Sequence, residues 1–482
     1  MSVRQSASAT TSERRWAVRL ALAFTAAALL LHVPGLVGRL FNSDEASLAT
    51  MAMEIQRGGT LYHETADRKP PAVPYLYAAV FDATGRRDLR PVRAVGCLAL
   101  AGTALLLALE AKRRTGNRTA AVAAGVFLLA GTAANFPADS QAAGFELFML
   151  LPMTAAVVAA GRGKAVLAGL CLALACLCKQ TAFLTALPVA FLLFRASGWQ
   201  AVARAGAAAA ALIGVTAAAF GPRDFLLWTV TGNGGYLALR GSLLASVLRG
   251  LGMTSAFVAL NAVLIWCCVV ARRRGRVDWD LWLWLGGGAV AVLAGFRFFG
   301  HYYLQLVPPL ALIGAMGLPT VLRQWRLAVA GLAVPVVAMW VFGFSPPNAR
   351  GIIPYRDVAD RVRDLTTPED RIFVWGEYPE IYWAANREPA TRFIHTGFIT
   401  GNSGGRDAAA VEASDGVPGA WAFLAADIAA TPPDLIVDTG PASIRHSDLH
   451  PLEETFLWDE IVRHYLLVGV VDGVRLFQRV TP

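Results

Sequence analysis

Hydrophobic residues along this chain gather in long blocks and do not form alternating or helical stripes. Blocks that are apolar on all sides are typical of membrane-spanning helices, which need roughly 20 residues to cross a bilayer. By this length rule the pattern predicts about eleven spans. They lie near residues 16–38, 91–110, 119–137, 141–160, 165–179, 181–195, 205–221, 243–270, 280–298, 302–320 and 327–344. Spans 165–179 and 181–195 are short and meet at Lys179 and Gln180, so we expect a hairpin that turns near the outer surface.

Basic residues divide the connections between these spans into two classes. Every second loop is rich in Lys and Arg, namely the loops at 111–118, 161–164, 271–276 and 321–326. The positive-inside rule places these loops and the N-terminus in the cytoplasm. An odd number of spans then places the C-terminal segment outside the cell membrane.

One region departs from that rule. Segment 72–83 is too short to cross a bilayer, and we expect it to dip only part-way into the membrane. Four arginines that follow it then lie on the outer side: Arg86, Arg87, Arg90 and Arg93.

Composition agrees with an integral membrane protein. Of the 482 residues, 56% are hydrophobic and 16% are charged, whereas soluble proteins carry nearer ~25% charged residues. The net charge of +9 is spread over short loops and forms no single basic face. This distribution argues against a nucleic-acid partner.

The C-terminal part of the chain has a different pattern, so we expect a transmembrane domain over 1–344 and a small extracytoplasmic α/β domain over 345–482. In "YRDVADRVRDL", the residues Val358, Val362 and Leu365 have helical spacing. The stretches "RIFVWG" and "DLIVDTG" are typical of buried strands. The last stretch, "LLVGVVDGVRLFQRV", predicts a hairpin around Asp472-Gly473.

The first outer loop, residues 39–90, opens with "NSDEASLATMAMEIQRGG", which predicts a helix that ends at Gly58-Gly59. Asn42 or Ser43 is a suitable N-cap. Its apolar stripe consists of Leu48, Met51, Ala52 and Ile55. Asp44 and Glu45 fall in the first turn, where the helix dipole favours their ionised forms. One interpretation is that the two carboxylates only cap a helix lying on the membrane surface.

A series of motifs in a fixed order favours a second interpretation. The series comprises Asp44-Glu45, Gly58-Gly59, Lys69-Pro70-Pro71, "AAGFELFMLLP" around Glu146, "LCKQTAFL" around Lys179-Gln180, "RFFGHYYLQLVPPLAL" from Arg297 and "DRIFVWGEYPEIYWAANREPATRF" in the tail. This order resembles the GT-C class of membrane glycosyltransferases. Within that class it is most similar to the bacterial branch near protein O-mannosyltransferases and lipid A aminoarabinose transferase, glycosyltransferase family 39. The resemblance implies a polytopic, all-α GT-C fold with a small C-terminal α/β domain.

The resemblance also implies an activity. Such enzymes move a sugar from a polyprenyl-phosphate carrier to an acceptor hydroxyl on the outer face of the membrane. The acceptor hydroxyl must lose its proton, which requires a carboxylate base. The departing lipid phosphate must be stabilised by cations. A phosphate leaves as an anion without a general acid, so direct displacement with inversion at the sugar carbon is expected.

The resemblance assigns the candidate residues. Asp44 is the expected base and Glu45 the second choice. The expected donor phosphate-binding residues are Lys69, Lys179, Arg297 and His301. The expected sugar-binding residues are Glu146, Asp139, Gln180, Tyr302 and Gln305. Family members often have an Asn shortly before Glu146, where this chain has Ala143-Gly144-Phe145, so the acceptor stays open among glycan, lipid and protein.

No metal or further cofactor is expected beyond the lipid-linked donor. His63, Glu64 and Asp67 lie close together, but their spacing matches no usual zinc signature. Two other functions fit a chain with many spans and intramembrane charges: a transporter or flippase of lipid-linked glycans, and a non-catalytic membrane protein that binds glycan. Sugar transfer by the purified protein separates these hypotheses.

Overall fold

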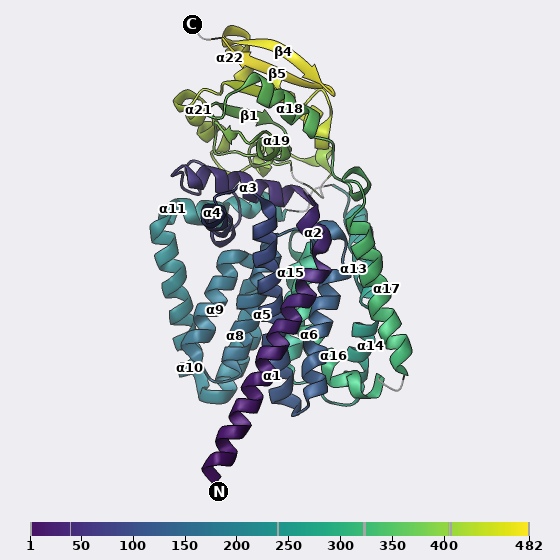
Figure 1. Ribbon diagram of the computed structural model, residues 1–482. Coiled ribbons are helices and arrows are strands. Elements are labelled where there is room, and N and C mark those ends of the chain that lie inside the picture. Colours follow the sequence, from purple (N-terminus) through teal and green to yellow (C-terminus); the bar gives the residue numbers. More distant parts are fainter. Residues whose placement is uncertain are drawn as a thin grey trace.

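The structure is a computed structural model that describes residues 2–38, 40–238, 241–321, 324–402, 404 and 407–480. A bundle of long helices carries a mixed α/β part at one end, and the N-terminus lies at the opposite end of the bundle (Figure 1). The bundle helices are α1 (Ser2–Leu31), α5 (Leu89–Thr115), α6 (Arg118–Ala133), α8 (Phe145–Ala160), α9 (Ala165–Cys178), α10 (Ala186–Ala219), α13 (Leu243–Leu260), α14 (Ala262–Arg273), α15 (Trp279–Leu293), α16 (Val307–Val321) and α17 (Trp325–Gly343).

The helix boundaries agree with most of the predicted spans. Helix α9 ends at Cys178 and Lys179 follows it, where the sequence predicts a hairpin. Helix α10 contains two helices joined at Ser197 and Gly198, whose backbone is not helical, so 181–195 and 205–221 belong to separate helices.

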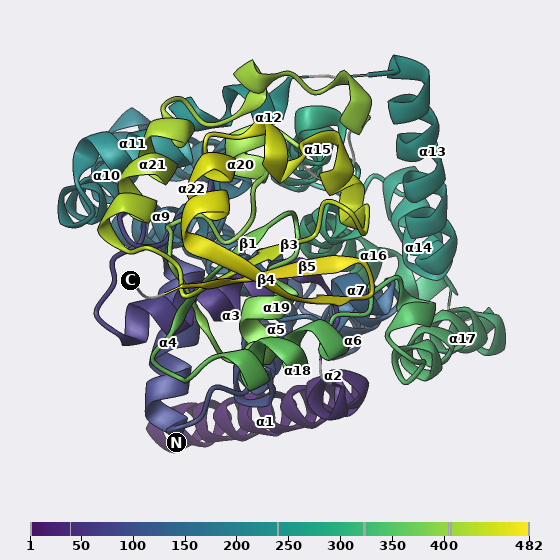
Figure 2. The same ribbon diagram turned by 90° about the horizontal axis from the view of Figure 1, so that it is seen from above.

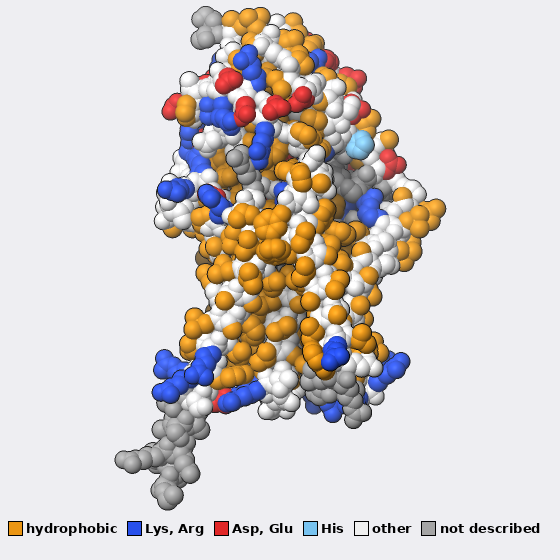
Figure 3. Space-filling model, turned by 45° about the vertical axis from the view of Figure 1, so that its right-hand side comes forward, with side chains coloured by type: hydrophobic (Ala, Val, Ile, Leu, Met, Phe, Trp, Pro, Cys, Tyr) orange, Lys and Arg blue, Asp and Glu red, His pale blue; other side chains and the backbone are white. Residues whose placement is uncertain are grey.

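Five stretches within the described residues are long and apolar enough to cross a membrane. They are Leu89–Thr115, Gln180–Ala219, Leu243–Leu260, Trp279–Phe296 and Trp325–Gly343. Lys and Arg side chains gather at the end of the bundle that holds the start of α1 (Figure 3). This multi-pass architecture agrees with the predicted fold class, and the count of eleven spans stays a prediction.

Short elements cover the other end of the bundle. They are α2 (Val33–Val37), α3 (Ser43–Gln56), α4 (Ala72–Thr84), α7 (Pro137–Ser140), α11 (Pro222–Thr229), α12 (Gly234–Leu237) and the 3-10 segments η1 (Gln180–Thr185) and η4 (Gly300–Leu306). The segment 72–83, which was predicted to enter the membrane only part-way, forms helix α4.

The α/β part is built on one five-stranded sheet with the order β2-β1-β3-β5-β4. Its strands are β1 (Arg371–Trp375), β2 (Glu388–Pro389), β3 (Leu435–Asp438), β4 (Tyr465–Val471) and β5 (Val474–Arg479). Strand β1 is parallel to β2 and β3, whereas β5 is antiparallel to β3 and β4.

Helices cover both faces of this sheet. Seen from above, α18 (Arg356–Leu365) and α19 (Glu380–Ala385) lie on one side, and α21 (Ala420–Ala430) and α22 (Leu457–His464) on the other (Figure 2).

The predicted elements of this part are confirmed. Helix α18 buries Val358 and Val362, and β1 and β3 occupy the two predicted strands. Asp472 and Gly473 have φ values of 49° and 83°, the left-handed geometry that a two-residue hairpin turn requires.

Candidate active site

Helix α3 places Asp44 at the boundary between the bundle and the α/β part. The Asn42 Oδ1 accepts a hydrogen bond from the Glu45 N–H at 2.9 Å, so the predicted N-cap is confirmed at Asn42. Residues 45–54 of this helix are all buried, and α4 and α19 both contact it. The helix is therefore enclosed between the two parts of the chain and does not lie free on a membrane surface.

Asp44 lines a small cavity, and the unfilled space of about 250 Å³ includes its open mouth. Three other ionisable residues line the same cavity: Asp139, Glu146 and His301. Within the described ranges, no hydrogen bond reaches the Asp44 carboxylate. Burial raises the pKa of Asp44, but the positive charges of Lys69, His301 and Lys179 lower it by more, and the resulting pKa is about 2. The carboxylate is thus ionised at neutral pH and its oxygens are available to a ligand.

Lys69 faces Asp44 from the first outer loop. Its Nζ lies 3.5 Å from Asp67 Oδ2 and 4.5 Å from the centroid of the Phe145 ring. Burial lowers the pKa of Lys69, but the negative charges of Asp44 and Asp67 raise it above its usual value. Lys69 therefore keeps its positive charge although most of its side chain is covered.

Glu146 has the partner that a carboxylate at the start of an apolar helix requires. Lys179 Nζ forms an ion pair with it and lies 4.2 Å from the centroid of the Tyr302 ring. His301 lies between two carboxylates, with Nδ1 3.1 Å from Asp139 Oδ1 and Nε2 3.7 Å from Glu146 Oε1. Residues far apart in the sequence thus form one charge cluster around the cavity.

Glu45 lies outside the Asp44 cavity. Its carboxylate accepts hydrogen bonds from Arg93 Nε at 2.7 Å and Nη2 at 2.5 Å. It also accepts one from the Ala143 N–H at 3.0 Å. Both charged side chains of the pair are almost fully buried, so Glu45 fixes the first turn of α3 against α5 and the segment before α8.

Arg297 and Tyr302 belong to a layer next to the cavity. Arg297 donates hydrogen bonds to the carbonyls of Gly404 at 3.0 Å and Tyr236 at 3.1 Å. The hydroxyls of Tyr302 and Tyr236 are 2.7 Å apart. Neither Arg297 nor Tyr302 is among the residues that line the Asp44 cavity. The Tyr302 ring contacts Lys179, which forms the ion pair with Glu146 on the cavity wall.

The two predicted glutamines bind backbone carbonyls. Gln180 Nε2 donates to the carbonyls of Arg68 at 2.6 Å and Thr229 at 3.1 Å. Gln305 Nε2 donates to the Tyr302 carbonyl at 2.9 Å. In this arrangement both amides brace neighbouring segments and do not line the Asp44 cavity.

His395 was missed by the sequence analysis. It follows β2 in the α/β part, and its charge also lowers the pKa of Asp44. Its Nδ1 lies 3.2 Å from Glu377 Oε2. An isolated histidine in "RFIHTGF" carries no motif, so only the three-dimensional arrangement identifies it as a neighbour of the site.

The three residues considered for a metal site point to different partners. His63 Nε2 lies 3.9 Å from Asp224 Oδ2. Glu64 Oε2 accepts a hydrogen bond from the Thr60 N–H at 2.8 Å, and Asp67 faces Lys69. No group of three His, Cys, Asp or Glu side chains suited to a metal ion occurs in the part of the chain that the structure describes.

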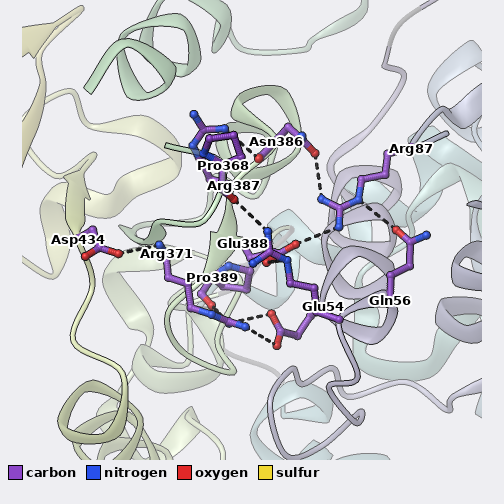
Figure 4. Close-up of polar contacts among 11 residues, drawn as sticks. Glu54, Gln56, Arg87, Pro368, Arg371, Asn386, Arg387, Glu388, Pro389 and Asp434 are labelled. Atoms are coloured by element: carbon purple, nitrogen blue, oxygen red, sulfur yellow. Dashed lines mark hydrogen bonds and ion pairs between the residues drawn. The ribbon is translucent and has the colours of Figure 1, made fainter. Parts of the chain in front are cut away.

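The α/β part holds α3 at both ends. At the first turn, Ser43 Oγ donates to Glu380 Oε1 at 2.6 Å. At the last turn, Glu54 accepts hydrogen bonds from Arg371 Nη1 at 2.9 Å and Nη2 at 3.1 Å (Figure 4). Arg57, which follows the helix, forms an ion pair with Glu388. These contacts fix the helix that carries Asp44.

Comparison with known proteins agrees with the motifs. Residues 68–222 match the family model of dolichyl-phosphate-mannose-protein mannosyltransferases. No curated protein matches the chain by sequence.

Solved structures share the fold over almost the whole chain. ArnT from Cupriavidus metallidurans, bound to undecaprenyl phosphate, superposes with a TM-score of 0.63 at 13% identity, covering 95% of this chain and 98% of that one. The archaeal oligosaccharyltransferase AglB from Archaeoglobus fulgidus, in complex with an inhibitory peptide and a dolichol-phosphate, gives a TM-score of 0.53 at 13% identity, with 97% and 75% coverage. The family model and the shared fold together support a glycosyltransferase of the GT-C class, as the motif order predicts.

Proposed function

We propose that this GT-C class glycosyltransferase transfers a sugar, with inversion, from a polyprenyl-phosphate donor to an acceptor hydroxyl on the outer face of the cell membrane. Similar proteins support the choice of donor, since the ArnT structure holds undecaprenyl phosphate and the AglB structure a dolichol-phosphate. The acceptor is a glycan, a lipid or a protein.

Asp44 is the proposed base, and its environment carries the proposal. It is an ionised carboxylate that lines a cavity next to Lys69, Lys179 and His301. A base must approach the proton it removes, and an unpaired carboxylate on a cavity wall can do so. Glu45 is tied to Arg93, so we assign it the role of holding Asp44 in position.

The donor itself would activate this base. A carboxylate with a pKa of about 2 binds a proton weakly, whereas general bases work best when their pKa lies nearer the working pH. The donor phosphate is an anion, and its binding to Lys69 and Lys179 offsets the charges that depress the pKa of Asp44. Basicity then rises when the donor is in place, which favours proton removal at the moment of transfer.

The remaining assignments follow from position. Lys69, Lys179 and His301 bind the donor phosphate and stabilise it as it leaves, because each is a cation or potential cation beside the cavity. Arg297, whose guanidinium lies over the Tyr236 ring, supports the same region from the adjacent layer. Glu146 and Asp139, which line the cavity, bind sugar hydroxyls. Tyr302, Gln180 and Gln305 do not line the cavity, and they hold the neighbouring segments in place.

We infer the membrane orientation from the charges at the two ends of the bundle. The end with the N-terminus carries the gathered Lys and Arg side chains (Figure 3), which the positive-inside rule assigns to the cytoplasm. Helix α3, which carries Asp44, and the α/β part are at the other end (Figure 1), and we assign that end to the outer face. The α/β part, residues 345–482, would then be extracytoplasmic.

A transfer assay tests this function. The purified protein is given a labelled polyprenyl-phosphate sugar and an extract of envelope acceptors, and the product linkage is determined. We expect an inverted linkage, and a loss of roughly 10²- to 10⁴-fold for Asp44→Asn with unchanged thermal unfolding. Movement of the labelled lipid across vesicles without sugar transfer would support the transporter instead, and glycan binding without either activity would support a non-catalytic protein.

A further inference from the structure

A second hollow lies at the other end of α3 and contains about 1050 Å³ of unfilled space, including its open mouth. We call it the seam groove, because it lies between the bundle and the α/β part. It is lined by Gln56, Phe81, Asp82, Gly85, Arg86, Arg87, Trp383 and Asn386. Gln56 follows Asp44 by twelve helical positions, or roughly 18 Å, so the seam groove is separate from the Asp44 cavity.

The walls of the seam groove are cross-linked. Arg87 donates hydrogen bonds to Gln56 Oε1 at 3.1 Å, Asn386 Oδ1 at 3.1 Å and Glu388 Oε1 at 3.0 Å (Figure 4). Gln56 Nε2 donates to Asp82 Oδ1 at 2.7 Å. One guanidinium thus joins α3, the end of α19 and β2, so the groove is formed before any ligand binds.

Arg86 is the unmatched charge in this region. The sequence places four arginines on the outer side against the positive-inside rule, and three of them have carboxylate partners. Arg93 binds Glu45, Arg90 binds Asp88 and Arg87 binds Glu388. Arg86 is exposed on the groove wall, and among the described residues no carboxylate pairs with it. A guanidinium left free in a groove is suited to bidentate binding of a phosphate or carboxylate.

The other wall residues are suited to a sugar. The Phe81 and Trp383 rings are nearly parallel, 15° apart in plane and 5.9 Å apart at their centroids. Phe81 is fully buried, whereas Trp383 is part-exposed and lines the groove. An indole presents apolar area together with a polar N–H group. The carboxylate of Asp82 and the amides of Gln56 and Asn386 provide hydrogen-bond groups for hydroxyls.

We propose that the seam groove binds a saccharide that carries a phosphate or carboxylate group, with Arg86 on the anionic group and Trp383 against the sugar ring. Since it shares α3 with Asp44, this saccharide is the part of the acceptor that lies away from the reacting hydroxyl; that assignment rests on the proposed transfer function. The existence of the binding site does not rest on that function, because a saccharide can bind in the groove without any sugar transfer.

The test measures binding on the full chain in nanodiscs of neutral phosphatidylcholine. The probe is a fluorescent disaccharide 1-phosphate, compared with the same disaccharide without phosphate. Because a hydrogen bond to a charged group contributes strongly to binding, we expect the phosphorylated probe to bind roughly tenfold more tightly. Arg86→Gln removes this difference, and Arg90→Gln, an exposed neighbour outside the groove, retains it. Trp383→Leu weakens both probes, with thermal unfolding as the check on folding.

Other results would overturn the proposal. These are equal affinities for the two probes, an unchanged difference in Arg86→Gln, or an equal loss in Arg90→Gln. Inorganic phosphate that competes as well as the sugar phosphate would mean a general anion site. Nanodiscs with phosphatidylglycerol that block the probe through Arg86 would mean a site for a lipid headgroup. All these measurements are repeated on Asp44→Asn, so that a failure of transfer does not affect them.

Discussion

The two ends of helix α3 use carboxylates in opposite ways. At the last turn, Glu54 is buried and held by two hydrogen bonds from Arg371. At the first turn, Asp44 is surrounded by cations that lower its pKa to about 2, yet within the described ranges none of them hydrogen-bonds to it. A carboxylate with all its bonds made holds structure together, whereas an ionised one on a cavity wall is available for chemistry. Glu45, next to Asp44, belongs to the first kind.

The largest effect outside Asp44 itself is expected at Lys69. Lys69→Met removes a cation from the proposed phosphate-binding site, and we expect transfer to fall by roughly 10²-fold, as for other groups that stabilise developing charge. Removing this positive charge also raises the pKa of Asp44, so the acid limb of the pH–rate profile shifts to higher pH. In the wild type the pKa of Asp44 is about 2, so Asp44 stays ionised and we expect no acid limb between pH 4 and pH 8.

The measurement is kcat/KM for transfer between pH 4 and pH 8. Lys164→Met, which removes an exposed lysine at the opposite end of the bundle, serves as the control and should leave both rate and profile unchanged. If Lys69→Met, like the wild type, shows no acid limb between pH 4 and pH 8, then Lys69 does not act on the base.

The next effect concerns stability. Glu45→Gln leaves the buried Arg93 without its carboxylate, and breaking one side of a buried pair costs about 3–5 kcal/mol. We expect a strongly destabilised protein, as measured by denaturant unfolding in detergent. Activity per folded molecule should fall less than in Asp44→Asn. If Glu45→Gln unfolds normally but loses transfer as fully as Asp44→Asn, then Glu45 takes part in the chemistry.

The sequence predicts where helix α3 begins and ends. Asn42 caps α3 and Gly58 follows its end with φ of 93°, because caps and left-handed glycines are encoded within a few residues. The hairpin at Asp472-Gly473 was predicted for the same reason. The candidate base was identified because a family motif keeps Asp44 and Lys69 close in sequence.

The roles of the neighbours could not be predicted in the same way. Which carboxylate faces the cavity depends on Arg93, which is 48 positions from Glu45, and the far end of α3 depends on Arg371, 317 positions from Glu54. Likewise, His395 comes close to Asp44 only because the α/β part covers the bundle. Such contacts follow from tertiary packing, for which a single sequence provides no periodic pattern.

A smaller effect is expected at the paired end of the helix. Glu54→Gln keeps the shape of the side chain but weakens its bonds to Arg371, and a hydrogen bond to a charged group contributes about 1.5–3 kcal/mol. We expect faster hydrogen exchange in the last turn of α3 and in β1, as measured by mass spectrometry. Asp360→Asn, which alters an exposed pair with Arg363, should leave exchange in both segments unchanged. Equal exchange in Glu54→Gln and wild type would mean that this pair does not hold the helix.

The most direct test of the contrast is the single-turnover rate of sugar transfer in Asp44→Asn and Glu54→Gln, measured side by side at equal amounts of folded protein. The account predicts a loss of at least roughly 10²-fold in Asp44→Asn, and a rate within about tenfold of wild type in Glu54→Gln. Transfer at the wild-type rate by folded Asp44→Asn would contradict the assignment of Asp44 as the base.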